Sequence, residues 1–147
     1  RESGGLDALS SAANVLDQGR ALGIFPEGTR SKRTEAPFLL PGKTGVARLA
    51  ASYPECVVVP IALIGTRNMM QPQKHKFPRL HKQVTIQSGE GITWYQWLTD
   101  VNGGNQSAES LKLLAEKEEH EIRSELAAIY RRFTDQLMGS ILALGAP

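Results

Sequence analysis

Apolar residues in the first fifty positions follow helical spacing twice and form one continuous run. In residues 5–18, leucine and alanine recur every three or four positions and Gly19 follows, so the pattern predicts an amphipathic helix that ends at this glycine. Residues 21–25 are an apolar run, which predicts a short buried strand. Residues 43–51 predict a second, shorter helix.

The remaining chain predicts two strands and then helices. Residues 57–64 are the most hydrophobic stretch and rich in β-branched side chains, which is typical of a buried strand. Pro60 cannot donate to a sheet, so we expect an edge or irregularity there. Residues 82–87 alternate and predict a strand. Residues 107–147 predict a C-terminal helical region, capped by Ser107 or Ser110, whose apolar face packs on the sheet: Ile122, Leu126, Ile129, Tyr130, Phe133, Leu137, Ile141 and Leu144.

This alternation predicts an α/β fold in which helices flank a mixed or mostly parallel sheet. The sequence predicts one domain over residues 1–147. Three strands are few for a complete sheet, and the sequence opens on Arg1 rather than Met. We therefore expect a partial domain, truncated at its N-terminus, that exposes a sheet edge and an apolar face.

Composition excludes several classes of protein. Of the 147 residues, 41% are apolar, which favours a globular fold over disorder. The net charge of +2 arises from 17 basic and 15 acidic residues, a balance that does not favour a nucleic-acid partner. The single cysteine, Cys56, excludes an internal disulfide and a cysteine-rich metal site, and we expect no metal. No apolar run approaches the ~20 residues of a membrane-spanning helix.

The candidate chemistry lies where the chain leaves residues 21–25. A Pro-Glu-Gly turn there brings a carboxylate, hydroxyls and a guanidinium close together: Glu27, Gly28, Thr29, Arg30 and Ser31. Lys32 and Arg33 follow. A tight turn with backbone N–H groups beside basic side chains suits an anion, above all a phosphate. An ordinary solvated turn is the alternative interpretation.

The string Phe-Pro-Glu-Gly-Thr-Arg-Ser at residues 25–31 resembles the third signature block of the glycerolipid acyltransferases, which include the 1-acyl-glycerol-3-phosphate acyltransferases. Lys43 with Gly45 resembles the Lys-x-Gly that precedes a helix in this family. Residues 59–62, Val-Pro-Ile-Ala, resemble its fourth block. Residues 89–92 resemble a family turn in which Gly91 replaces the usual proline.

The resemblance implies a glycerol-3-phosphate acyltransferase-like fold and a function for each block. Glu27 and Gly28 would place the glycerol 3-phosphate moiety, while Arg30 and neighbouring groups would hold its phosphate. Arg1 occupies the position of a family arginine that contacts the phosphate, although a solvated terminal arginine is an equal alternative. The implied substrate-binding set is Glu27, Gly28, Thr29, Arg30, Ser31, Lys43 and Arg1, with Val59 and Pro60 on the acyl side.

The family's catalytic His-x4-Asp block is not found in this sequence. His75 and His81 are followed five positions later by Leu80 and Ile86. His120 is followed at that distance by Glu125, but it lies after the signature rather than before it. We therefore identify no catalytic residue, and we expect this chain alone to be inactive.

The resemblance also implies partners. These are a lysophospholipid acceptor (lysophosphatidic acid, giving phosphatidic acid) and an acyl-CoA or acyl-carrier-protein thioester as co-substrate, with no bound cofactor. The expected location is the cytoplasmic face of a membrane, peripheral or anchored by segments outside this sequence. A basic patch over residues 74–82, interrupted by Phe77, Pro78 and Leu80, suits anionic headgroups or a solvated loop. Trp94, Tyr95 and Trp97 predict packing, with a lipid interface as the second interpretation.

Two other functions stay open. One is a non-catalytic phosphoglyceride-binding module with an acyltransferase-like site. The other is a soluble α/β domain that binds nucleotide phosphates at the basic turn; it ranks last because the sequence lacks Gly-x4-Gly-Lys-Ser/Thr.

Overall fold

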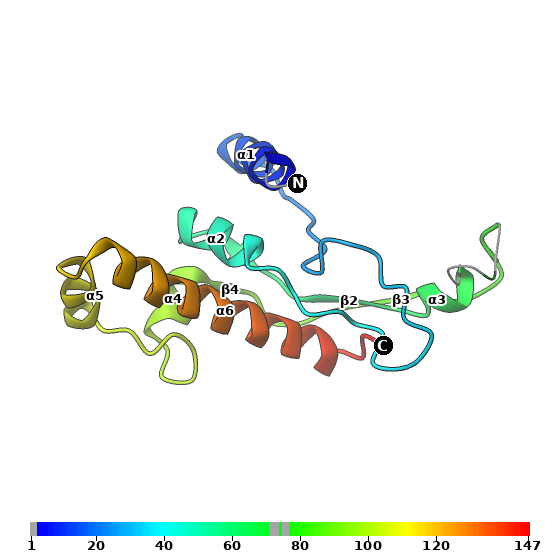
Figure 1. Cartoon of the computed structure of the whole chain (residues 1–147). Helices are drawn as coiled ribbons and strands as arrows, with labels where there is room; N and C mark the ends of the chain where they lie inside the picture. The colour runs from blue at the N-terminus through cyan, green and yellow to red at the C-terminus, as the bar shows by residue number, and fades with distance from the viewer. Residues whose placement is uncertain (1–2, 71–73, 75–76) are drawn as a thin grey trace.

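The computed structural model describes residues 3–70, 74 and 77–147. Helices and short strands alternate along the described chain (Figure 1). In order they are α1 (Ser3–Asp17), α2 (Gly45–Ser52), β1 (Val57–Val58), β2 (Ile61–Ile64), α3 (Thr66–Met69), β3 (Thr85–Ser88), β4 (Ile92–Thr93), α4 (Trp94–Thr99), α5 (Ala108–Ala115) and α6 (Glu119–Ala143).

The described strands form two antiparallel pairs rather than a mixed or parallel sheet. β1 pairs with β4 and β2 pairs with β3, with Ile61 opposite Ser88. The prediction of mixed or parallel pairing is therefore wrong. The register runs in opposite directions along the two chains, with Ile61 opposite Ser88 and Ile64 opposite Thr85, so β3 returns along β2 instead of running parallel to it.

We call the β1–β4 pair and the β2–β3 pair together the ribbon. Pro60 interrupts the strand segment that runs from β1 to β2, as the sequence predicts. Residues 59–60 separate β1 from β2, and the Gly89 N–H donates to the Pro60 carbonyl oxygen over 2.9 Å. Because proline has no N–H to donate, the ladder breaks at this position and resumes on either side.

The predicted strand at residues 21–25 does not form. These residues have no regular structure, and the side chains of Ile24 and Phe25 are 42% and 72% exposed. A strand needs a neighbour to satisfy its N–H and C=O groups. None of the described strands pairs with this segment.

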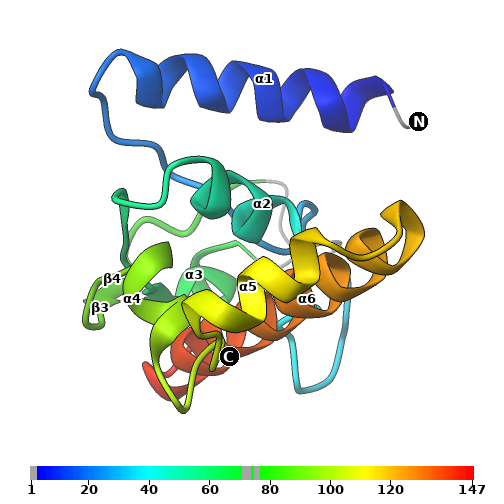
Figure 2. The ribbon, with the colours of Figure 1, turned by 90° about the vertical axis from the view of Figure 1, so that its left-hand side faces the viewer.

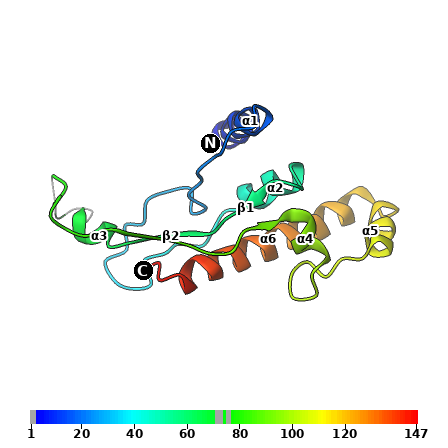
Figure 3. The same cartoon turned by 180° about the vertical axis from the view of Figure 1, so that it is seen from behind.

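The core lies between α6 and one face of the ribbon (Figures 1 and 3). The predicted apolar face of α6 is confirmed, since Phe133, Leu137 and Ile141 are buried along it. Trp97 meets Phe133 edge to face, with ring centroids 4.9 Å apart, and Trp94 is also buried. Packing is therefore the role of both tryptophans, as predicted, whereas the same prediction is wrong for Tyr95, which is 61% exposed.

The other face of the ribbon is open. Residues 57–64 alternate, so that Ala62 is buried while Val57, Val59 and Ile61 are 58%, 45% and 49% exposed. Ile86 on β3 is 68% exposed. The prediction of a buried strand therefore holds for one face only. We call Val57, Val59, Ile61 and Ile86 the open face.

Helix α1 lies apart from the ribbon and packs against α2 (Figures 1 and 2). Its predicted end is confirmed, because Gly19 has a φ of +68° and its N–H donates to the Leu16 carbonyl. The Tyr53 hydroxyl donates to Asp17 Oδ1 over 2.7 Å. No helix within the described ranges is long and apolar enough to cross a membrane.

Candidate functional site

The candidate site begins at the turn formed by residues 25–28. The Gly28 N–H donates to the Phe25 carbonyl oxygen over 2.9 Å, and Gly28 has a φ of +67°. Proline restricts φ at the first central position, while glycine adopts positive φ without steric cost. The sequence thus predicts this turn correctly, even though no strand leads into it.

Lys43 lies against the turn from a distant part of the sequence. A Cβ atom added at Gly28 would lie 2.9 Å from Cδ and 3.1 Å from Nζ of Lys43. The Lys43 N–H also donates to the Pro26 carbonyl oxygen over 2.8 Å. Lys43 directly precedes Thr44, the N-cap of α2, where backbone N–H groups favour an anion. The structure therefore brings together two residues of the predicted substrate-binding set.

Helix α6 holds the backbone beside Lys43. Arg131 Nη1 donates to the Gly42 carbonyl oxygen over 2.8 Å, while Nε and Nη2 of the same guanidinium bind Asp135 over 3.0 and 2.7 Å. Gly42 is buried, and a Cβ atom there would lie 2.8 Å from side-chain atoms of both Thr134 and Met138. Sequence reasoning missed these positioning residues. The four-residue spacing of Arg131 and Asp135 is evident in the sequence, but the hydrogen bond from Arg131 to the Gly42 carbonyl oxygen is not.

Glu27 has a structural partner. Its Oε2 accepts a hydrogen bond from the Leu40 N–H over 2.6 Å. Arg33 Nη1 reinforces the same loop by donating to the carbonyl oxygens of Pro37 and Leu39 over 2.8 and 3.2 Å. The hydrogen bond from Leu40 to Glu27 therefore connects the turn to the segment that leads to Lys43.

Arg30 and Lys43 have no internal partner among the described residues. Arg30 and Lys43 are exposed, and neither side chain makes a hydrogen bond or ion pair within the part of the chain that the structure describes. Thr29 is also exposed. Ser31 is half-buried, and its Oγ accepts from the Arg33 N–H over 3.4 Å. The turn thus presents unneutralised positive charge to solvent, which is what an anion requires.

The other predicted site residues lie apart from this turn. Val59 belongs to the open face, whereas Pro60 is buried and a Cβ atom at Gly89 would lie 3.0 Å from its Cγ. Val59 is therefore accessible from solvent, whereas Pro60 is not. Arg1 and His75 lie outside the described residues.

The two described histidines do not reach the turn. His81 is exposed after α3, and His120 is exposed in the first turn of α6, beside α5 (Figure 1). Glu125, the acidic residue at family spacing from His120, pairs instead with Lys117. Across the described ranges, no group of three or more His, Cys, Asp or Glu side chains is placed to hold a metal ion.

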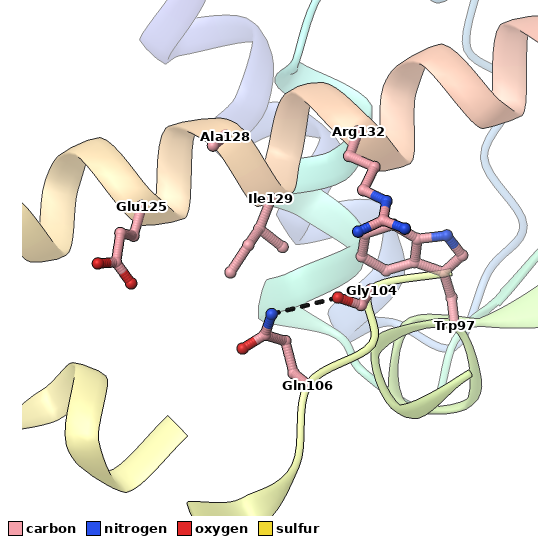
Figure 4. Close-up of a pocket in the computed structure, with 7 residues that line it drawn as sticks. All are labelled: Trp97, Gly104, Gln106, Glu125, Ala128, Ile129 and Arg132. Carbon is pink, nitrogen blue, oxygen red and sulfur yellow. Dashed lines mark hydrogen bonds between the residues drawn. The ribbon is translucent and has the colours of Figure 1, made fainter. Parts of the chain in front are cut away.

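Two shallow cavities lie elsewhere in the molecule. The cavity in Figure 4, of about 260 Å³, is lined by Trp97, Gly104, Gln106, Glu125, Ala128, Ile129 and Arg132. A second, of about 480 Å³, lies between α1 and α2 and is lined by Leu9, Ser10, Ala13, Asp17, Arg48, Leu49, Ser52 and Tyr53. Neither is lined by a residue of the turn.

Comparison with known families gives one match. Residues 1–64 match the family model described as Acyltransferase. This range contains the turn, Lys43 and Val59, and the match supports the acyltransferase family and transferase activity in general. No curated protein and no solved structure matches the chain.

Proposed function

We propose that this chain carries the acceptor-binding part of an acyltransferase of phospholipid biosynthesis. The acceptor is lysophosphatidic acid, the donor is an acyl-CoA or acyl-carrier-protein thioester, and the product is phosphatidic acid. Because the acceptor is a membrane lipid, the protein works at the cytoplasmic face of a membrane. The family match over residues 1–64 supports acyl transfer as the chemistry.

The observation that carries the proposal is the contact between Lys43 and Gly28. A phosphate over the turn meets the Lys43 ammonium, and Arg30 follows Gly28 by two residues with no internal partner among the described residues. The N-terminus of α2 adds its partial positive charge. Val59, which is 45% exposed on the open face apart from the turn, is the residue that we assign to the acyl side of the acceptor.

The reaction needs a base that this chain does not supply at the turn. The acceptor hydroxyl loses its proton as its oxygen attacks the thioester carbonyl, and the thiolate then leaves as a thiol. Neither described histidine makes a hydrogen bond to the turn. We therefore expect the chain alone to bind the acceptor without transferring the acyl group.

The direct test is calorimetric titration of the full chain with lysophosphatidic acid, using lysophosphatidylcholine as the headgroup control. Arg30→Gln and Lys43→Gln each remove one cation without adding an opposite charge. We expect at least about tenfold weaker binding for each variant, since a hydrogen bond to a charged group contributes about 1.5–3 kcal/mol.

Lys112→Gln is the matched control, because Lys112 is an exposed lysine on α5, far from the turn. It should bind as the unsubstituted chain does. Equal affinity for all variants would rule out this phosphate site, and equal affinity for both lysolipids would contradict its preference for a phosphomonoester headgroup.

A second candidate is a phosphoglyceride-binding module with no catalytic role. The positions of His81 and His120 favour it, since both are exposed and outside the turn. Intact mass and N-terminal sequencing of the protein from its native source separate the two. A native chain with His-x4-Asp upstream of Arg1 indicates the enzyme, and one that starts at Arg1 indicates the module.

A further inference from the structure

The most exposed large apolar side chains of the described residues lie together among basic residues. Leu80 and Phe77 are 84% and 81% exposed. The described basic side chains around them are Lys74, Arg79, His81 and Lys82. We call these six residues the basic tip.

Two backbone hydrogen bonds connect the basic tip to α3 and place Leu80 in a turn. The Arg79 N–H donates to the Met69 carbonyl oxygen over 2.8 Å, which ties the tip to the end of α3. The Lys82 N–H donates to the Arg79 carbonyl oxygen over 3.0 Å, so Leu80 and His81 occupy the centre of a turn. Figures 1 and 3 show α3 near one extremity of the molecule.

Charge is separated along the molecule. From Cys56 to Gly89 the sequence contains no Asp or Glu. Acidic residues gather instead where α5 meets α6, at the opposite end in Figure 1: Glu116, Glu118, Glu119 and Glu121. The net charge of +2 therefore does not reveal that positive and negative charge lie at opposite ends. This separation favours an orientation in which the α3 end faces a negative surface.

We propose that the basic tip docks on the surface of an anionic lipid bilayer. Phe77 and Leu80 enter the boundary between headgroups and acyl chains, while Lys74, Arg79 and Lys82 remain among the headgroups. A nucleic acid would satisfy the cations but would leave most of the Leu80 side chain in water. A bilayer removes both apolar side chains from water and meets the charge at the same time.

Docking at the tip would also orient the candidate site. Arg67 on α3 donates from Nη2 to the Arg33 carbonyl oxygen over 2.6 Å, and its guanidinium lies 3.9 Å from the centre of the Phe38 ring. Arg33 follows Arg30 by three residues. The tip is therefore tied through α3 to the segment that continues the turn. The proposal itself rests on exposure and charge, independently of the proposed acyl transfer.

The test is co-sedimentation of the full chain with mixed phosphatidylcholine–phosphatidylserine vesicles and with pure phosphatidylcholine vesicles. Neither contains lysophosphatidic acid, so the result is independent of the phosphate site. We expect binding to the anionic vesicles alone, weakened by salt. Lys74→Gln with Lys82→Gln should lower the partition coefficient about 30-fold, and Phe77→Ser with Leu80→Ser by at least about tenfold.

Val101→Ser with Leu113→Ser is the matched apolar control, because these side chains are 74% and 57% exposed away from the tip. It should bind as the unsubstituted chain does, and circular dichroism checks that every variant is folded. A dye attached through Leu80→Cys in a Cys56→Ser background should report an apolar environment on vesicle binding.

Three results would overturn the proposal. They are no vesicle binding, equal loss in tip and control variants, and a dye that stays in water. A single-stranded oligonucleotide that binds the chain through the same lysines, in the absence of vesicle binding, would assign the tip to nucleic acid instead.

Discussion

Two glycines determine where Lys43 lies. Gly28 leaves room for the Lys43 side chain, and Gly42 leaves room for Thr134 and Met138 of α6. Thr134 is fully buried and its hydroxyl donates to the Tyr130 carbonyl oxygen over 2.8 Å, so it has little freedom to move aside. Residues with no side chain thus set the geometry of the candidate site, because the space beside them is already occupied.

We therefore expect Gly42→Ala to destabilise the protein. Its Cβ would lie 2.8 Å from Thr134 Cγ2 and from Met138 Cγ, and overpacking of this kind costs about 1–3 kcal/mol. Urea unfolding measures the change. Gly139→Ala is the control, since an added Cβ on this exposed face of α6 meets nothing within 4 Å. It should stabilise the protein by about 0.5–1 kcal/mol, and equal effects of the two changes would contradict the argument.

At the scale of elements, α1 is held by its packing against α2 and by Tyr53, the residue that follows α2. The Tyr53 hydroxyl, just past the end of α2, donates to Asp17 in the last turn of α1. This hydrogen bond raises the pKa of Tyr53 above its usual value of 10.0, and partial burial and the negative charge of Asp17 act in the same direction. One tyrosine therefore reports on the contact between the two helices.

A titration of the phenol tests this contact. A raised pKa means that the folded state favours the neutral phenol, so the stabilising contribution is complete below about pH 10 and is lost as pH rises through the raised pKa. Asp17→Asn should lower the Tyr53 titration midpoint, measured by phenolate absorbance. Because the chain has three tyrosines, comparison with Tyr53→Phe identifies the part of the absorbance change that Tyr53 contributes. An unchanged midpoint in Asp17→Asn would show that α1 does not hold Tyr53 in solution.

For the molecule as a whole, the open face is the main energetic liability. α6 covers one side of the ribbon, while Val57, Val59, Ile61 and Ile86 face solvent on the other. The residues from β1 to β2 pair along one edge only among the described strands. Clustered apolar area beside an unpaired strand edge promotes association between copies.

We expect the isolated chain to associate as its concentration rises. Sedimentation velocity should show this, and Ile61→Thr with Ile86→Thr should reduce it, because threonine keeps strand propensity while adding a hydroxyl. Val101→Thr with Leu113→Thr, exposed away from the ribbon, should leave association unchanged. A monomer at every concentration would mean that the open face does not drive association.

The sequence determined those features that depend on neighbours along the chain. The helices predicted at residues 5–18 and 43–51 appear as α1 and α2, and Gly19 ends the first of them. Of the two predicted caps, Ser107 is the N-cap, and its Oγ accepts from the Ser110 N–H. The break at Pro60 was likewise predictable. Periodicity, capping and proline geometry act within a few residues, so a single stretch of sequence contains their cause.

Only the tertiary structure decided what depends on distant partners. An apolar run such as residues 21–25 becomes a strand only if another strand lies beside it, and none of those described does. The antiparallel direction of the ribbon, the exposure of one of its faces and the hydrogen bond from Arg131 to Gly42 have the same origin. Each requires segments far apart in the chain to meet. The sequence indicates a candidate set of substrate-binding residues, and the tertiary structure decides which of them, such as Gly28 and Lys43, lie together.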